Sequence, residues 1–130
     1  LFRNQENINF VKDAMFASTN EPGGTSYRSR FKSKKLMFAG KTGSSQIKKF
    51  TEAQREAEVK QTEIDYNDRD HALFIAFAPA DKPKYAISVL VEHGGSGSSA
   101  AAPIAKEVIK KTLERDSIRE NRSKFLGEEI

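Results

Sequence analysis

The sequence predicts an α+β fold in which a three-stranded antiparallel sheet carries an N-terminal and a C-terminal helix. Three patterns support this prediction: apolar residues at helical spacing near the start of the chain, short apolar runs in its middle, and a second helical stripe after residue 100. The 130 residues have the length of one domain, and no internal repeat is visible.

The first helix is predicted over residues 5–18. Proline and glycine in the stretch 20–24 follow its last turn, where such residues commonly end a helix. The positions that recur at helical spacing are Ile8, Val11, Ala14, Met15 and Ser18.

The first strand is predicted at residues 36–39, a short continuous apolar run that leads into Gly40-Lys-Thr-Gly43. Residues 46–70 are almost wholly polar and are expected to form a long exposed connection, although Thr51 and Gln54 have the spacing of a capping box that could start a short helix. Connections of this length are uncommon inside a compact domain and are usually functional or mobile.

Two further strands are predicted at residues 72–78 and 85–91. Both runs are rich in β-branched and aromatic residues, and the prolines between them indicate a turn, so we expect a hairpin. Because both runs are nearly continuous in apolar residues, we also expect helices to cover both faces of the sheet.

The last helix is predicted to begin at Ala100, after a flexible connector at residues 94–99. We expect it to run for about four turns and to cover the hairpin. The mostly charged residues 117–130 are expected to fray. The apolar stripe of this helix consists of Ile104, Val108, Ile109 and Leu113.

The composition limits the classes of function. Lys and Arg number 22 against 18 Asp and Glu, a net charge of +4, and much of the excess lies at Arg28–Lys35. This run is either a solvated loop or the contact surface of a small basic module that binds nucleic acid or an acidic partner.

The chain has no cysteine, which excludes a disulfide framework and Cys-ligated zinc. No apolar run approaches the roughly 20 residues that span a bilayer.

The stretch with the clearest chemical content is Ala39-Gly-Lys-Thr-Gly-Ser-Ser-Gln46, which contains the Lys-Thr-Gly element of serine acyltransferases. Strand alternation places the hydroxyls of Thr42 and Ser44 on one face and Lys41 on the other, and Gly43 allows close approach to the backbone. Two hydroxyl donors beside a lysine suit a substrate carboxylate, and an unpaired N–H of Ser44 could donate to an oxyanion.

Two other interpretations of this octapeptide are open to test. It could be an ordinary polar strand end, with no ligand. It could also be a phosphate-binding loop, but Lys35 stands where that loop needs its first glycine, and the apolar residues 36–39 cannot surround a phosphate.

Four segments stand in this order along the chain: Glu21-Pro-Gly-Gly-Thr-Ser26, residues 39–46, Asp70-His-Ala-Leu-Phe-Ile-Ala-Phe-Ala-Pro79, and Val91-Glu-His-Gly-Gly-Ser-Gly-Ser-Ser99. Together they resemble class B penicillin-binding proteins over most of residues 8–114. The resemblance implies part of a penicillin-binding or β-lactamase-like transpeptidase fold, so residues 1–130 are expected to be the incomplete C-terminal portion of the domain. The start at Leu1, without a targeting pattern, agrees with a piece of a longer protein.

The resemblance implies a function for the parent protein. It would be a D,D-transpeptidase that crosslinks peptidoglycan stem peptides through an acyl-serine intermediate and is inhibited covalently by β-lactams. It would be anchored in the bacterial inner membrane, with this domain in the periplasm, and would serve cell-wall synthesis and cell shape. No metal or organic cofactor is implied, and nucleic acid is not an expected partner.

The resemblance also implies roles for individual residues. Lys41 would support the proton-transfer network, while Thr42, Gly43 and Ser44 would hold the carboxylate of the donor peptide or of penicillin. The Ser44 N–H would be one oxyanion donor. Many relatives have threonine where Ser44 stands, a difference that keeps the hydroxyl.

The family's nucleophile motif, Ser-x-x-Lys, and its Ser-x-Asn motif should precede Lys-Thr-Gly by a long stretch. The formal matches here, Ser18-Thr-Asn20, Ser29-Arg-Phe-Lys32 and Ser45-Gln-Ile-Lys48, are in the wrong order or the wrong place. An activated serine needs a base held within reach. We therefore expect the nucleophile to lie outside this chain, and the chain alone to be inactive.

The remaining ionisable residues suggest no second site. His71 and His93 bracket the hairpin strands without a partner at metal-ligand spacing, so we expect structural roles and no metal. The aspartates of the connection, Asp65, Asp68 and Asp70, are expected to be solvated.

One expectation concerns assembly. In the family, the strand at residues 85–91 pairs with a strand from the other half of the domain. Without that partner its edge would be exposed, so the isolated chain is expected to form a homodimer through it.

Overall fold

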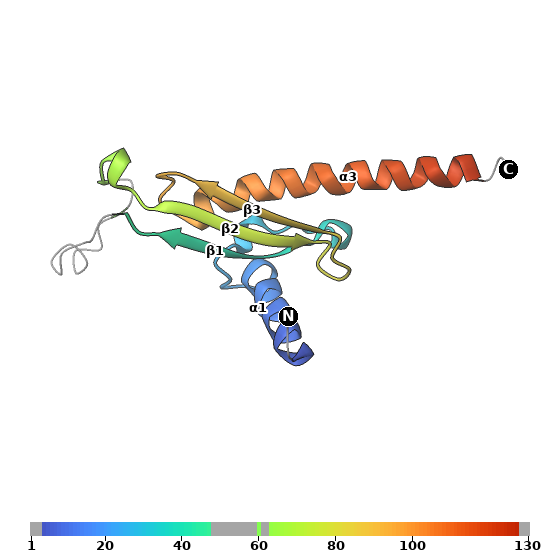
Figure 1. Ribbon diagram of the computed structural model, residues 1–130, viewed down its shortest axis with the longest axis horizontal. Helices are drawn as coiled ribbons and strands as arrows, with labels where there is room; N and C mark the ends of the chain where they lie inside the picture. Colours follow the sequence, from blue (N-terminus) through green and yellow to red (C-terminus); the bar gives the residue numbers. More distant parts are fainter. Residues whose placement is uncertain (1–3, 48–59, 61–62, 128–130) are drawn as a thin grey trace.

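The computed structural model describes residues 4–47, 60 and 63–127. Its main elements are helix α1 (Gln5–Asn20), strand β1 (Ala39–Ser45), the hairpin strands β2 (His71–Ala78) and β3 (Tyr85–Val91), and helix α3 (Ala102–Gly127). The strands form one antiparallel sheet in the order β1-β2-β3, which confirms the predicted α+β arrangement (Figure 1).

Helix α1 forms where the sequence predicts it and is two residues longer. The Asn4 side chain caps it by accepting a hydrogen bond from the Glu6 N–H at 2.8 Å. Its apolar residues do not meet a core among the described residues: Phe10 is 75% exposed, and the one buried residue of the helix is Thr19. The predicted apolar face is therefore largely uncovered.

Strand β1 starts later than predicted. Leu36 closes a 3-10 turn at Lys34–Leu36, in which its N–H donates to Ser33 O, so it cannot also lie in the ladder. The strand instead includes the whole Lys-Thr-Gly element. The two hairpin strands have the predicted bounds to within one residue, and the Cα register places Thr42 opposite Phe74.

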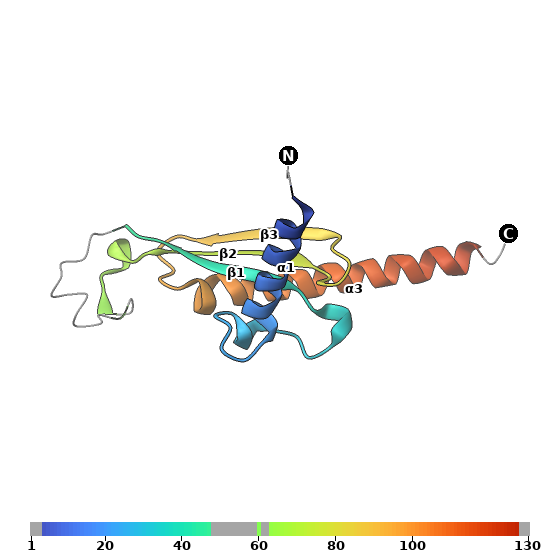
Figure 2. The same cartoon turned by 90° about the horizontal axis from the view of Figure 1, so that it is seen from below.

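One face of the sheet is buried and the other is open. The side chains of β2 on the buried face, from Ala72 to Ala78, form the core with α3 and with Phe38. On the other face Ile75 is 51% and Leu90 is 56% exposed. The expectation that helices cover both faces is thus wrong for the described part of the chain, because α1 lies beside the edge of β1 (Figures 1 and 2).

The start of the C-terminal helix differs from the prediction. The end of the expected connector is wound into a π-helical turn at Gly97–Ala101, which continues directly into α3. Ile104 and Val108 are each 47% exposed, so the predicted stripe is partly wrong. Small residues allow close packing instead, and the buried set is Ala101, Ala102, Ala105, Ile109 and Leu113.

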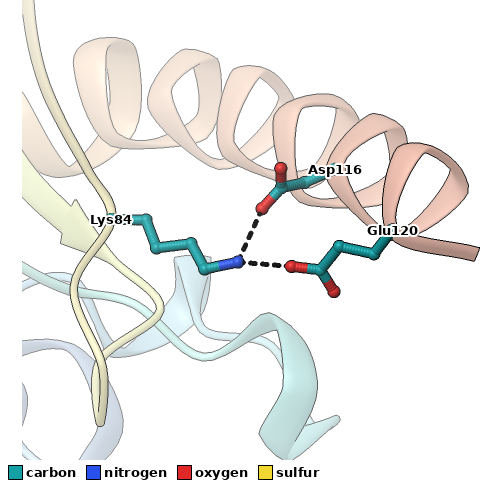
Figure 3. A network of polar contacts seen from close by, with 3 residues as sticks. All are labelled: Lys84, Asp116 and Glu120. Atoms are coloured by element: carbon teal, nitrogen blue, oxygen red, sulfur yellow. Dashed lines mark hydrogen bonds and ion pairs between the residues drawn. The ribbon is translucent and has the colours of Figure 1, made fainter. Parts of the chain in front are cut away.

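The end of α3 also differs, because the helix continues to Gly127 and projects beyond the sheet (Figures 1 and 2). Lys84, in the β2–β3 connection, holds it through ion pairs with Asp116 at 3.1 Å and Glu120 at 2.6 Å (Figure 3). The hydrogen bonds to Glu120 and Asp116 raise the pKa of Lys84, and the bond from Lys84 lowers the pKa of Asp116. The expectation that residues 117–130 fray is therefore wrong for residues 117–127, whereas residues 128–130 lie outside the described residues.

The capping-box pair Thr51 and Gln54 lies outside the described residues. Among the helices that the structure describes, none has both the length and the apolar character to cross a membrane.

Candidate functional site

The Lys-Thr-Gly element lies on the outer edge of the sheet, since β1 pairs with β2 on one side only. The orientation of its backbone follows from Gly40, whose N–H donates to the Thr19 hydroxyl at 3.0 Å and therefore points away from β2. Backbone groups of an antiparallel strand alternate in direction with a period of two. The N–H and C=O groups of Thr42 and Ser44 consequently also point to this outer edge.

Helix α1 closes one part of this edge. Thr19 Oγ1 lies 3.0 Å from Gly40 N and 3.3 Å from Gly40 O, and Asn20 Nδ2 donates to Phe38 O at 2.9 Å. These two side chains take the place of a fourth strand up to Gly40. Beyond them, from Thr42 onward, the edge is accessible.

The cation of the site lies at the start of the accessible edge. Lys41 Nζ donates to Thr42 O at 2.9 Å and lies 3.4 Å from Thr42 Oγ1. The side chain is exposed, and within the described residues it has no carboxylate partner. Lys41 therefore places an uncompensated positive charge beside the hydroxyl of Thr42.

Thr25, which is not among the site residues predicted from the sequence, contacts this site directly. Thr42 Oγ1 donates to Thr25 Oγ1 at 3.1 Å, and Thr25 Oγ1 lies 3.2 Å from Ser18 Oγ. Gly24 makes this possible, because a Cβ atom there would overlap the backbone oxygen of Ser18. The family resemblance of the segment 21–26 is the one sequence signal that could identify Thr25.

The side chains of Thr42 and Ser44 lie on one face of β1 and that of Lys41 on the other, as the alternation of side chains along a strand predicts. A Cβ atom at Gly43 would meet no described atom closer than 3.4 Å, so packing within the chain does not demand glycine there. A glycine at that position instead leaves the exposed face of β1 open to a ligand.

The two histidines pack together at the end of the hairpin. The His93 N–H donates to His71 Nδ1 at 3.0 Å, and the two rings meet edge to face with centroids 5.0 Å apart. His93 Nδ1 lies 3.3 Å from Arg69 O. The described residues contain no cluster of three or more side chains that could hold a metal ion. These contacts give both histidines a structural role.

Two of the formal motif matches have structural contacts or burial of their own among the described residues. The Ser18 hydroxyl is bonded to Thr25, and Ser29 is only 5% exposed. Lys48 of the third formal match lies outside the described residues.

The basic run does not form one surface. Arg30 folds back onto Tyr27, with its guanidinium 3.6 Å from the ring centroid and a 2.9 Å hydrogen bond to Tyr27 O. Arg28 lines a cavity near α3, whereas Lys35 lines a separate one beside Lys84. The run is thus divided among different environments.

The chain matches the family described as penicillin binding protein transpeptidase domain over residues 3–110. It is 36% identical over 99 residues to the peptidoglycan D,D-transpeptidase MrdA of Salmonella typhimurium, covering 76% of this chain and 15% of that protein. It is 47% identical over 70 residues to MrdA of Acinetobacter baumannii, covering 54% of this chain and 10% of that protein. The chain therefore spans less than a fifth of the length of these relatives.

Solved structures of penicillin-binding proteins also match this chain over a small part of their length. PBP2 of Helicobacter pylori, in its complex with MreC, matches with a TM-score of 0.67 and 32% identity over 84% of this chain and 17% of that chain. PBP2 of Pseudomonas aeruginosa, in complex with WCK 5153, matches with a TM-score of 0.64 and 32% identity over 85% of this chain and 20% of that chain.

Proposed function

Because this chain belongs to the penicillin-binding protein transpeptidase domain family, we propose that its parent protein is a peptidoglycan D,D-transpeptidase of the PBP2 type, in which β1 forms one wall of the active site. The observation that carries the proposal is the position of Lys-Thr-Gly on the accessible part of the outer edge. There the Lys41 ammonium, the Thr42 hydroxyl and the outward N–H of Ser44 lie within a few residues of one another.

The proposed reaction proceeds through an acyl-serine. A serine from outside these 130 residues attacks the carbonyl carbon of the donor peptide, and its proton passes to a neighbouring base. The tetrahedral intermediate then expels the terminal residue as an amine, which takes a proton. The amine of a second peptide attacks the acyl-serine, forms the crosslink and releases the serine.

The chain's own residues would hold the substrate and stabilise charge during both steps. The Ser44 N–H would donate to the oxyanion, and the hydroxyls of Thr42 and Ser44 would bind the terminal carboxylate. Gly43 would let the substrate approach the strand. Lys41 would supply positive charge to the carboxylate and to the proton-transfer network.

The names of the relatives support cell-wall synthesis as the cellular context. As a PBP2-type enzyme, the parent would act in cell-wall synthesis that maintains cell shape, with this domain in the periplasm and an anchor in the inner membrane. The H. pylori protein was solved with MreC, which makes a similar protein a reasonable partner to test. No finding favours the alternative of a basic module that binds nucleic acid.

Mass spectrometry of the full-length protein after incubation with a β-lactam tests the proposal. We expect one covalent adduct, on a serine outside residues 1–130, and no adduct on the isolated 130-residue chain. An adduct on any serine of the chain would contradict the assignment of the nucleophile, and no adduct on the full-length protein would contradict the proposed enzyme class.

A further inference from the structure

The two histidines connect the end of the hairpin to the strand that carries Lys-Thr-Gly. His71 is the first residue of β2 and lies opposite Ser45, the last residue of β1 (Figure 1). Its Nδ1 accepts a hydrogen bond from the His93 N–H at 3.0 Å, which we call the His71–His93 bond. This bond holds the turn after β3 against the start of β2.

The turn is well defined by its own backbone. His93 has φ 54°, in the left-handed region that histidine and asparagine enter more readily than most residues with a side chain. The Gly95 N–H donates to Asp70 O at 2.8 Å, and the Ser96 N–H to Gly94 O at 2.9 Å. The turn is therefore tied twice to the beginning of β2, once through His71 and once through the residue before it.

The turn leads directly to the strand of the site. Gly97, a few residues after His93, is buried, and a Cβ atom there would overlap Leu73 O. The same atom would lie 2.8 Å from Gly43 O and 3.1 Å from Thr42 Cβ. Since the backbone packs this closely, a displacement of the turn must also displace Thr42 and Gly43, which we assign to the substrate.

The His71–His93 bond exists only while the His71 ring is neutral. A backbone N–H can only donate, so Nδ1 must present its lone pair and the ring proton must lie on Nε2. When the ring binds a second proton, both nitrogens carry hydrogen and neither can accept. The His93 N–H then loses its acceptor, and the turn loses one of its two contacts with the start of β2.

Histidine is the residue type near this bond whose charge changes close to neutral pH. Its side chain ordinarily titrates at about pH 6.5, carboxylates at about pH 4, and tyrosine and arginine at about pH 10 or above. The His93 ring, which meets that of His71 edge to face and has Nδ1 3.3 Å from Arg69 O, is the second histidine to consider. The other titratable or charged residues on the segments next to the pair are Tyr66, Asp68, Arg69, Asp70 and Glu92.

We propose that His71 is a positioning residue for the Lys-Thr-Gly strand and that it acts only in its neutral form. The neutral ring holds the turn at residues 93–97 against β1, and thereby holds Thr42 and Gly43 in place for the substrate. In acid the bond is lost, the turn loosens and acylation slows. This inference rests on the proposed function, because it concerns the rate of the same reaction, in which His71 itself touches no substrate.

The test compares two measurements on the full-length protein at about pH 8 and about pH 5.5, on either side of the ordinary histidine range. The first is the protection factor of the amides of residues 92–97, from hydrogen exchange followed by mass spectrometry. It requires no enzymatic activity. The second is the rate of acylation by a fluorescent penicillin.

Three variants separate the contributions of the two rings. In His71→Asn, the side-chain oxygen can replace Nδ1 as the acceptor and does not titrate. His71→Ala removes the acceptor at every pH. His93→Asn is the matched control, since it keeps the backbone N–H and suits the left-handed φ but removes the other imidazole.

In the unmodified protein we expect the protection of residues 92–97 to fall about tenfold from the higher to the lower pH, the size of one lost hydrogen bond. Its acylation rate should fall roughly fivefold more than that of His71→Asn, a comparison that cancels the pH dependence of the reaction itself. His71→Asn should keep its protection at both pH values. His71→Ala should show weak protection and slow acylation already at the higher pH, and His93→Asn should respond to acid as the unmodified protein does.

An acid response that persists in His71→Asn, or one that disappears in His93→Asn, would overturn the proposal. Normal acylation of His71→Ala at the higher pH would also overturn it, because the turn would then not position the strand. If His71→Ala failed to fold, the comparison with His71→Asn would still decide. If the unmodified protein were not acylated at either pH, the proposed function would fail and the positioning role with it, while the exchange data would still show whether the bond breaks in acid.

Discussion

The hydroxyl of Thr19, on helix α1, accepts a hydrogen bond from the backbone N–H of Gly40, on strand β1, at 3.0 Å. Both groups are buried, and Thr19 is fully excluded from solvent. One side chain of a helix thereby occupies the place of a neighbouring strand. This contact ends the accessible part of the sheet edge and establishes that Ser44 directs its N–H outward.

Thr19→Val tests this contact, because valine keeps the shape of threonine and removes the hydroxyl. The Gly40 N–H would then be buried without a partner, which costs about 1–3 kcal/mol of unfolding free energy. Urea denaturation of the protein measures the loss. Thr112→Val is the control, since it removes a hydroxyl that bonds within its own helix to Val108 O and should have a smaller effect.

Thr25→Val should weaken substrate binding at the strand without disturbing the fold. The variant removes the acceptor of the Thr42 hydroxyl, so that this hydroxyl is no longer held in one orientation. We expect the rate of penicillin acylation in the full-length protein to fall roughly fivefold, as for the loss of one neutral hydrogen bond. Thr25→Ser keeps the hydroxyl and should react at nearly the normal rate; if it were as slow as Thr25→Val, methyl packing rather than hydrogen bonding would be responsible.

The ion pairs of Lys84 predict a change at acid pH. The hydrogen bond from Lys84 lowers the pKa of Asp116 below its ordinary value of 3.8. A lowered carboxyl pKa stabilises the folded state above the ordinary value, and this contribution is lost as the pH falls through the lower pKa of the folded state. The protection factors of the amides around residues 114–120, which correct for the intrinsic pH dependence of exchange, should therefore fall below about pH 4.

Asp116→Asn provides the control for this effect. The asparagine cannot titrate, so the variant should show faster exchange in the same segment at neutral pH and a weaker dependence on acid. An unchanged acid response in Asp116→Asn would assign the effect to other carboxylates.

The uncovered edge of β3 leads to a prediction about the 130 residues expressed alone. The Gly40 N–H points away from β2, and backbone groups alternate in direction along each paired strand. Carried across the sheet by the strand register, this alternation places the N–H of Ser88 on the outer side of β3, away from β2. Such an edge can pair with a second copy. We expect light scattering to show self-association at micromolar concentration, and Ser88→Pro to weaken it without breaking a bond to β2.

Ile87→Pro is the contrasting variant, because the N–H of Ile87 points toward β2. It should damage the hairpin itself, which circular dichroism would report. A chain that stays monomeric at high micromolar concentration would contradict the proposed pairing.

Local patterns predicted the elements of the fold well. The helical spacing of residues 5–18 and the two apolar runs of the hairpin correspond to α1, β2 and β3, because these signals lie within each segment. The boundaries that were wrong depend on tertiary contacts. Helix α3 continues past residue 117 beside its ion pairs with Lys84, more than 30 positions away in the sequence, and no local pattern reports such a contact.

The site was predictable only in part, for a similar reason. The Lys-Thr-Gly element follows from a short motif. The outward direction of the Ser44 N–H also needs the hydrogen bond between Thr19 and Gly40, which fixes the phase of the strand's alternation. Neither the motif nor the alternation predicts the role of Thr25, because it depends on a loop that returns to Thr42 across 17 positions of sequence. The apolar positions Val11 and Ile75 are predicted to be covered, whereas the described residues leave them 54% and 51% exposed.

The rate of acylation of the full-length Lys41→Ala variant by a fluorescent penicillin tests the central claim most directly. The account predicts that acylation is abolished, since the substrate carboxylate would lose the positive charge beside Thr42, and that Thr42→Val has a milder effect. The control is Lys12→Ala on α1, which should react at the normal rate. Normal acylation of Lys41→Ala would contradict the assignment of β1 to the active site.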